Sequence, residues 1–129
     1  MIGIWNQYLH IYLYVLSIGM LIGFGLPLLF VPLYWARLFR WEIPQQAELT
    51  AFLGRSLGVF ICVVAVFAFR AANLPAVQPF FFDMLFWTLI GSIVLHIYGA
   101  IRKAQPITET VEILVWFLLL FATLAFYPI

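Results

Sequence analysis

Charged residues are scarce in this chain. Only 9% of its 129 residues are Asp, Glu, Lys or Arg, and 67% are hydrophobic, whereas an average soluble domain is about a quarter charged. A water-soluble domain of this length could not bury so much apolar surface, so most side chains must face lipid or neighbouring protein. The net charge is only +1 and no polybasic tract is present, which argues against a nucleic-acid-binding protein.

Cysteines and catalytic motifs are equally sparse. Cys62 is the only cysteine, so no intramolecular disulfide can form, and we interpret it as a small residue within an apolar run. The sequence contains no zinc-ligand spacing, nucleophile elbow, phosphate-binding loop or dinucleotide fingerprint. Composition and motifs therefore favour a protein that is not an enzyme, and they predict no metal site.

Long apolar segments, in contrast, account for most of the chain. Runs of about 20 residues, the length that crosses the hydrocarbon core of a bilayer, occupy residues 8–34, 49–69, 80–101 and 108–127. Prolines and charged residues separate these runs, as expected for the connections between spanning helices. The sequence predicts an all-α, multi-pass integral membrane protein, a four-helix bundle that forms a single transmembrane domain over residues 1–129.

Basic residues that flank the apolar segments predict the orientation. Arg37 and Arg40 lie in the first connection, Arg102 and Lys103 lie in the third, and Arg70 alone lies in the second. Cytoplasmic loops of membrane proteins are enriched in Lys and Arg, so we expect the first and third connections in the cytoplasm. Both termini would then lie on the non-cytoplasmic side.

The first apolar segment contains residues that interrupt helices. Pro27 and Pro32 each remove one backbone hydrogen bond from a helix, and two glycines precede them. We therefore predict a bend or an early helix end between Phe24 and Tyr34.

Four ionisable residues lie inside or at the edge of the apolar segments. In the predicted topology Arg55, His96, Glu109 and Glu112 share one depth, near the cytoplasmic ends of their helices. Charged side chains inside spanning helices are disfavoured by about 3 kcal/mol, and they generally turn inward and find partners. We predict a polar cluster in which Arg55 pairs with Glu112 and His96 is a third member. Alternatively, Arg55 extends to the lipid headgroups, and both glutamates are favourable acids at the start of their helix.

Polar and small residues recur at intervals of four, which marks helix faces that pack against other helices. Thr88, Ser92 and His96 would form one polar stripe that faces helices rather than lipid. Glycine pairs at the same interval favour close helix approach, and they are Gly19 with Gly23 and Gly54 with Gly58.

The two histidines raise the question of a cofactor, because neutral imidazole is a good ligand for haem iron or magnesium. His10 and His96 are predicted near opposite faces of the membrane, so they cannot hold one metal between them. His10 belongs to a second polar group near the non-cytoplasmic interface, which we interpret as ordinary interfacial polarity. No cofactor is predicted, and binding of a quinone, a lipid or haem stays open.

Three short stretches resemble known families of small membrane proteins. "GRSLGVF", "WTLIGSIVLHIYGA" and "PITETVEILVW" are similar to segments of the four-helix ergosterol-biosynthesis scaffold family and of DoxX-like proteins. The resemblance covers residues 49–127, and the first helix departs from it. The first family implies a non-catalytic tether for membrane enzymes, and the second implies an accessory subunit of a redox complex. The matching positions are Arg55, Gly58, His96, Tyr98 and Gly99.

Two functions are therefore compatible with the sequence. In the first, the chain is a non-enzymatic scaffold or accessory subunit that docks on partner membrane proteins or on further copies of itself within the lipid bilayer. In the second, a pocket around Arg55, His96 and Glu112 binds a quinone, a sterol or a lipid. Neither function involves nucleic acid.

Overall fold

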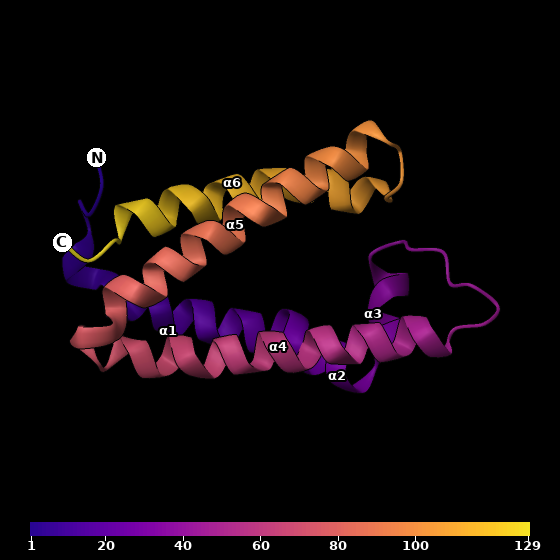
Figure 1. The fold of residues 1–129 in the computed structure, drawn as a ribbon, viewed down its shortest axis with the longest axis horizontal. Coiled ribbons are helices and arrows are strands. Elements are labelled where there is room, and N and C mark those ends of the chain that lie inside the picture. Colours follow the sequence, from indigo (N-terminus) through magenta and orange to yellow (C-terminus); the bar gives the residue numbers. More distant parts are fainter. The chain divides into compact units, whose positions relative to one another are not determined.

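The computed structural model describes residues Met1–Ile129 and contains only helices and their connections (Figure 1). The elements are the 3-10 helix η1 (Asn6–Tyr8), α1 (Leu9–Met20), the π-helix η2 (Leu21–Gly25), α2 (Leu26–Phe30), α3 (Pro32–Leu38), α4 (Glu48–Ala72), the 3-10 helix η3 (Pro75–Val77), α5 (Gln78–Ile101) and α6 (Ile107–Ala125). The expectation of an all-α chain is confirmed.

Four helical segments are long and apolar enough to cross a membrane. They are Asn6–Phe30, Glu48–Ala72, Pro75–Ile101 and Ile107–Ala125. Each contains most of one predicted apolar run, so the number and order of the candidate spans agree with the prediction from the sequence.

The helices belong to two compact units. We call Met1–Tyr12 together with Ala71–Ile129 the hairpin unit, because it contains the antiparallel pair α5 and α6 (Figure 1). We call Leu13–Arg70 the middle unit.

In the middle unit, α4 lies beside α1 and α2, and small residues allow the backbones to approach (Figure 1). The buried hydroxyl of Ser17 on α1 donates to the carbonyl of Ala65 on α4, at 2.6 Å. Gly58 packs directly on backbone, since a Cβ there would lie 2.6 Å from the amide nitrogen of Leu29 and 2.9 Å from the carbonyl oxygen of Gly25. The α2–α4 contact therefore depends on the absence of a side chain at Gly58.

The first candidate span is interrupted where its prolines predict. A π-helical turn precedes α2, and the helix stops at Val31, whose φ of −135° and ψ of 56° lie outside the helical region. Pro32 then begins α3, in a first turn where its missing N–H costs no hydrogen bond. Pro27 cannot donate to the carbonyl of Gly23, and the indole N–H of Trp35 donates to that carbonyl instead, at 3.0 Å. The predicted helix end between Phe24 and Tyr34 is confirmed.

In the hairpin unit, the N-terminal residues of the chain pack against the C-terminal end of α6. The amide of Gly3 donates to the carbonyl of Leu124 at 2.8 Å, so a carbonyl left over by the end of α6 has a partner. Gly3 has a φ of +71°, a left-handed conformation that favours glycine. Phe82 is fully buried, and its ring packs against the rings of Tyr12 and Tyr127. Aromatic rings therefore form part of the core of this unit, together with buried aliphatic side chains such as Leu85 and Leu89.

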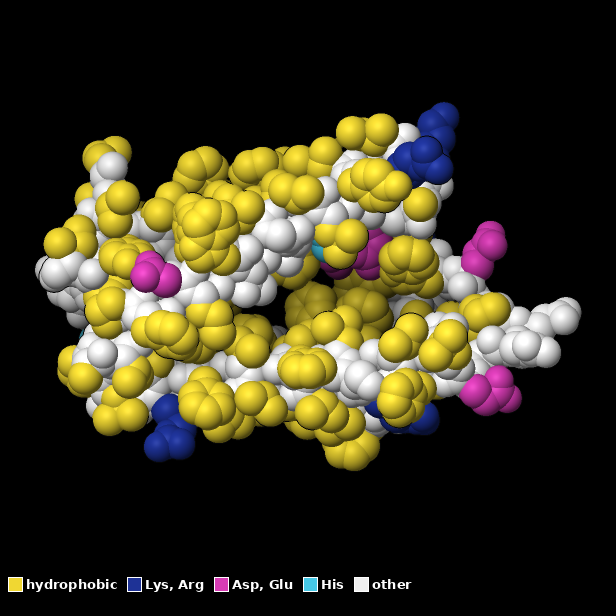
Figure 2. All heavy atoms as spheres, in the orientation of Figure 1, with side chains coloured by type: hydrophobic (Ala, Val, Ile, Leu, Met, Phe, Trp, Pro, Cys, Tyr) yellow, Lys and Arg dark blue, Asp and Glu magenta, His cyan; other side chains and the backbone are white.

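The exposed surface is largely apolar, and hydrophobic side chains cover most of the face in Figure 2. Large aromatic side chains are among the most exposed: Phe80 at 76%, Phe60 at 70% and Trp87 at 69%. Contiguous apolar surface of this kind needs lipid or protein to cover it.

Candidate functional site

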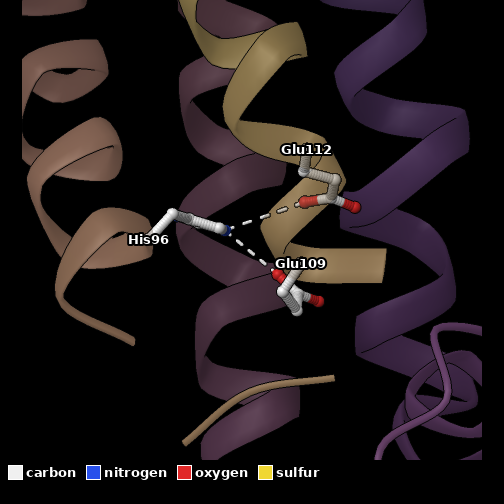
Figure 3. Close-up of side chains that lie close together, drawn as sticks. All are labelled: His96, Glu109 and Glu112. Atoms are coloured by element: carbon white, nitrogen blue, oxygen red, sulfur yellow. Dashed lines mark hydrogen bonds and ion pairs between the residues drawn. The ribbon is translucent and has the colours of Figure 1, made fainter. Parts of the chain in front are cut away.

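Three ionisable side chains meet between α5 and α6 in the hairpin unit, and they form the candidate site. His96 Nε2 lies 3.0 Å from Glu109 Oε2 and 3.7 Å from Glu112 Oε2. Figure 3 shows the imidazole edge from α5 directed at both carboxylates. The side chains are only 13%, 9% and 16% exposed in that order. We call these three residues the His–Glu–Glu cluster.

The two carboxylates owe their placement to the first turns of α6. Glu109 and Glu112 are three residues apart, so they lie on one face of the helix. The unpaired amides at the start of a helix also favour negative charge there. Both acids are therefore compatible with their own helix, although α6 has no other charged residue.

A hydrogen bond to the backbone of its own helix fixes the orientation of the His96 ring. Its Nδ1 lies 2.7 Å from the carbonyl oxygen of Ser92, which is one turn earlier in α5. A carbonyl oxygen can only accept, so Nδ1 carries the proton and donates. In the neutral ring Nε2 then presents a lone pair to the two glutamates.

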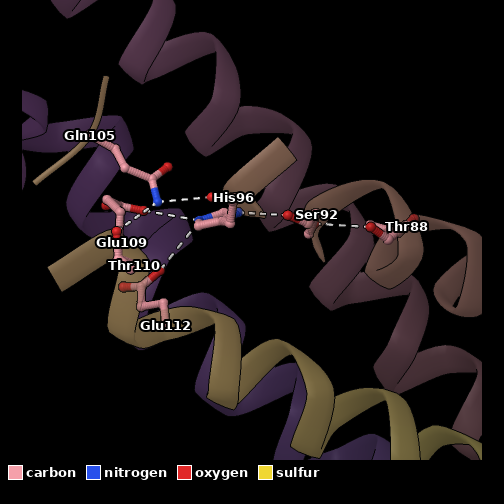
Figure 4. A network of polar contacts seen from close by, with 7 residues as sticks. All are labelled: Thr88, Ser92, His96, Gln105, Glu109, Thr110 and Glu112. Carbon is pink, nitrogen blue, oxygen red and sulfur yellow. Dashed lines mark hydrogen bonds and ion pairs between the residues drawn. The ribbon is translucent and has the colours of Figure 1, made fainter. Parts of the chain in front are cut away.

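The predicted polar stripe contributes to this network through the backbone. The hydroxyl of Ser92 donates to the carbonyl of Thr88 at 2.9 Å (Figure 4). The hydroxyl of Thr88 in turn donates to the carbonyl of Met84 at 2.8 Å. Hydroxyls bonded within their own helix have no need of a partner on another helix. Thr88 is exposed and Ser92 is half-buried, so neither side chain belongs to the His–Glu–Glu cluster.

Gln105 and Thr110 are members of the network that the sequence did not reveal. The Gln105 amide donates to the carbonyl of His96 at 3.0 Å and to the hydroxyl of Thr110 at 3.1 Å (Figure 4). Its side chain crosses α5 at Gly99, where a Cβ would clash with the amide group. A glycine near the end of α5, followed six residues later by a polar residue in the short connection, is the one signal in the sequence that points to this contact.

The turn before Gln105 has a defined geometry. Lys103 adopts a φ of +52°, its amide donates to the carbonyl of Ala100, and the amide of Ala104 donates to the carbonyl of Gly99. These are the two hydrogen bonds of a Schellman motif. The end of α5 is thereby fixed next to the start of α6, which positions His96 against the glutamates.

Trp116 lies one turn beyond Glu112 and packs against the imidazole, with 5.4 Å between the ring centroids of Trp116 and His96. Its indole N–H is buried and has no hydrogen-bond partner. Buried donors are rarely left unpaired, so this one is an available donor beside the site.

The remaining predicted site residues lie in the middle unit. Arg55 is on α4 with an exposed side chain, and its pairing with Glu112 stays a prediction. Of the glycines, Gly54 packs on Pro32 and Gly58 packs on the α2 backbone. A Cβ at Gly19 or Gly23 would meet nothing within 4 Å, so no other helix of the middle unit packs closely on that pair.

No family model, curated protein or solved structure matches this chain.

Proposed function

We propose that the chain is a multi-pass integral membrane protein that binds a small ligand at the His–Glu–Glu cluster, as a non-enzymatic accessory protein. Four helices of spanning length and an exposed apolar surface support the membrane location. The proposed topology has the α5–α6 connection in the cytoplasm, because it contains Arg102 and Lys103.

One observation supports binding at this place: three titratable side chains, each at most 16% exposed, converge between two apolar helices. Ionisable groups within membrane spans are unfavourable, and where they occur they usually serve an ion, a proton or a substrate. A protein that only docks on partners needs a packing surface and has no use for such a cluster. The observation therefore favours binding over the scaffold role, which stays a prediction.

The site also lies near one end of the hairpin. His96 lies five residues before the end of α5, and Glu112 lies five residues after the start of α6. At a rise of 1.5 Å per residue, both lie about 8 Å inside the helix ends. A ligand from the aqueous side has only a short distance to travel.

The test is the composition of the purified protein. The full chain is isolated from membranes in mild detergent, and native mass spectrometry compares the wild type with Glu109→Gln/Glu112→Gln. We expect a stoichiometric non-protein mass in the wild type and its loss in the variant, while the matched control Glu42→Gln/Glu48→Gln, which changes two exposed glutamates, retains it. Stoichiometric partner protein without any such ligand would overturn the proposal in favour of the scaffold.

A further inference from the structure

We propose that His96, Glu109 and Glu112 form a mononuclear site for a divalent first-row transition metal ion. The inference rests on the proposed function, namely that this cluster binds a small ligand, and it assigns the ligand's chemical class. It departs from the expectation of no metal site, which considered only the two distant histidines.

The spacing of the ligand atoms fits a small metal ion. One nitrogen and two carboxylate oxygens all lie within 4.8 Å of one another. Bonds of about 2.0–2.1 Å to a tetrahedral ion place any two ligand atoms about 3.4 Å apart. The distances of 3.0 and 3.7 Å from His96 Nε2 to the two carboxylates are close to this value on either side.

The tautomer of the neutral His96 ring also suits a metal ligand. Because Nδ1 donates to the Ser92 carbonyl, Nε2 of the neutral ring directs a lone pair at carboxylate oxygens that also offer lone pairs. Such an arrangement is repulsive unless a cation or a proton lies between the atoms. Histidines that bind metals commonly have their second ring nitrogen fixed by a carbonyl or carboxylate in this way.

A divalent ion matches the charge of the ligand set when both carboxylates are ionised. A neutral imidazole and two carboxylates carry a charge of −2, which one divalent cation cancels. Two protons would also neutralise the cluster, and this is the competing outcome that the experiment must separate.

The ligand set selects the class of metal. Imidazole nitrogen with carboxylate oxygen suits Zn²⁺, Fe²⁺, Co²⁺ and Mn²⁺, whereas Ca²⁺ and Mg²⁺ prefer oxygen alone and Cu⁺ prefers sulfur. Three protein ligands leave at least one coordination position for water or another small ligand. The unpaired indole N–H of Trp116, whose ring packs on His96, is a donor available to a fourth ligand.

The experiment measures metal binding by the full chain in detergent. The chain is purified with an affinity tag that contains no histidine, and a chelator first removes any bound metal. Co²⁺ is titrated and followed by its visible absorption, and the Zn²⁺ retained after desalting is counted by elemental analysis. We expect one ion per chain in the wild type, and at least 10-fold weaker binding in His96→Gln and in Glu109→Gln. The matched controls His10→Gln and Glu48→Gln change exposed residues and should bind as the wild type does.

Circular dichroism of each variant separates loss of the site from loss of the fold. A folded wild type that retains no Co²⁺ or Zn²⁺ would by itself overturn the metal proposal. Binding by His96→Gln that equals binding by the wild type would also overturn it. If the wild type binds no metal but an organic molecule is lost from Glu109→Gln/Glu112→Gln, the metal assignment is wrong and the proposed function stands. If neither kind of ligand depends on these residues, both proposals fail.

Discussion

His96 and Ser92 are joined by a hydrogen bond that can run in only one direction. The Ser92 carbonyl accepts and the imidazole Nδ1 donates, over 2.7 Å. This contact within α5 decides what the opposite edge of the ring offers to Glu109 and Glu112 on α6, and so it links a local feature of one helix to the chemistry between two.

Replacing only the histidine should destabilise the hairpin unit more than replacing all three residues of the cluster. His96→Leu removes the imidazole nitrogen that both carboxylates face, and breaking a largely buried polar arrangement in this way costs about 3 kcal/mol. The triple variant His96→Leu/Glu109→Leu/Glu112→Leu leaves no buried charge, so it should be more stable than the single variant. Thermal unfolding in detergent with a chelator present compares the two. A triple variant that unfolds first would contradict the electrostatic account.

The sequence predicted those features that depend on composition along a single helix. Apolar runs of spanning length predicted four helices, and Pro27 and Pro32 predicted the break that the structure has at Val31. Both signals are local, because span length and proline geometry require no knowledge of neighbouring helices.

Details of the site depend on rotation and on side-chain conformation, which composition does not encode. The positions of His96, Glu109 and Glu112 along their helices predicted that the three residues lie at one depth. The rotation of α6 about its axis then makes Glu109 the nearer of the two glutamates to His96. Gln105 lies in a connection, and its role depends on the turn at Lys103 and the space at Gly99. Neither rotation nor turn geometry can be inferred from hydrophobic runs alone.

Gly58 should tolerate no side chain, whereas Gly19 should. In Gly58→Ala the new Cβ would lie within 3.0 Å of backbone atoms of α2, which cannot move without separating the helices, so we expect a loss of about 1–3 kcal/mol. In Gly19→Ala the Cβ meets nothing within 4 Å, and alanine stabilises a helix by up to about 1 kcal/mol over glycine. Thermal unfolding of both variants checks the prediction. Equal destabilisation of the two would indicate that Gly19 packs against another copy of the chain.

Tyr127 and Asp83 should give a pH dependence at the alkaline end. The Tyr127 hydroxyl donates to Asp83 Oδ1 at 2.6 Å, and this hydrogen bond raises the pKa of Tyr127 above its ordinary value. A raised folded-state pKa means that the bond's stabilisation is complete below the unfolded pKa of about 10 and is lost as pH rises through the folded value. Asp83→Asn should therefore lower the pKa of Tyr127. Ultraviolet difference titration against Tyr127→Phe measures it, and an unchanged pKa would show that the hydrogen bond has no influence.

The predicted orientation is testable with single cysteines in a Cys62→Ser background. Gln45→Cys lies between α3 and α4, and Ala76→Cys lies in η3. Because basic residues favour the cytoplasm, a membrane-impermeant maleimide should label Ala76→Cys in intact cells and Gln45→Cys only after permeabilisation. The reverse pattern would invert the topology and would move the His–Glu–Glu cluster to the other face of the membrane.

Gly99 and Gln105 should behave as a coupled pair. Gln105→Ala removes the hydrogen bonds to the His96 carbonyl and to Thr110, at a cost of about 1 kcal/mol. Gly99→Ala should cost a similar amount, because its Cβ takes the space of the Gln105 amide group and displaces it from the same partners. Once Gln105 is alanine that clash is absent, so Gly99→Ala should then be neutral or stabilising, as expected for alanine in a helix. A double-mutant cycle on the free energy of unfolding tests this. If the losses in the free energy of unfolding were additive, the effect of Gly99→Ala would not depend on the Gln105 side chain that crosses α5.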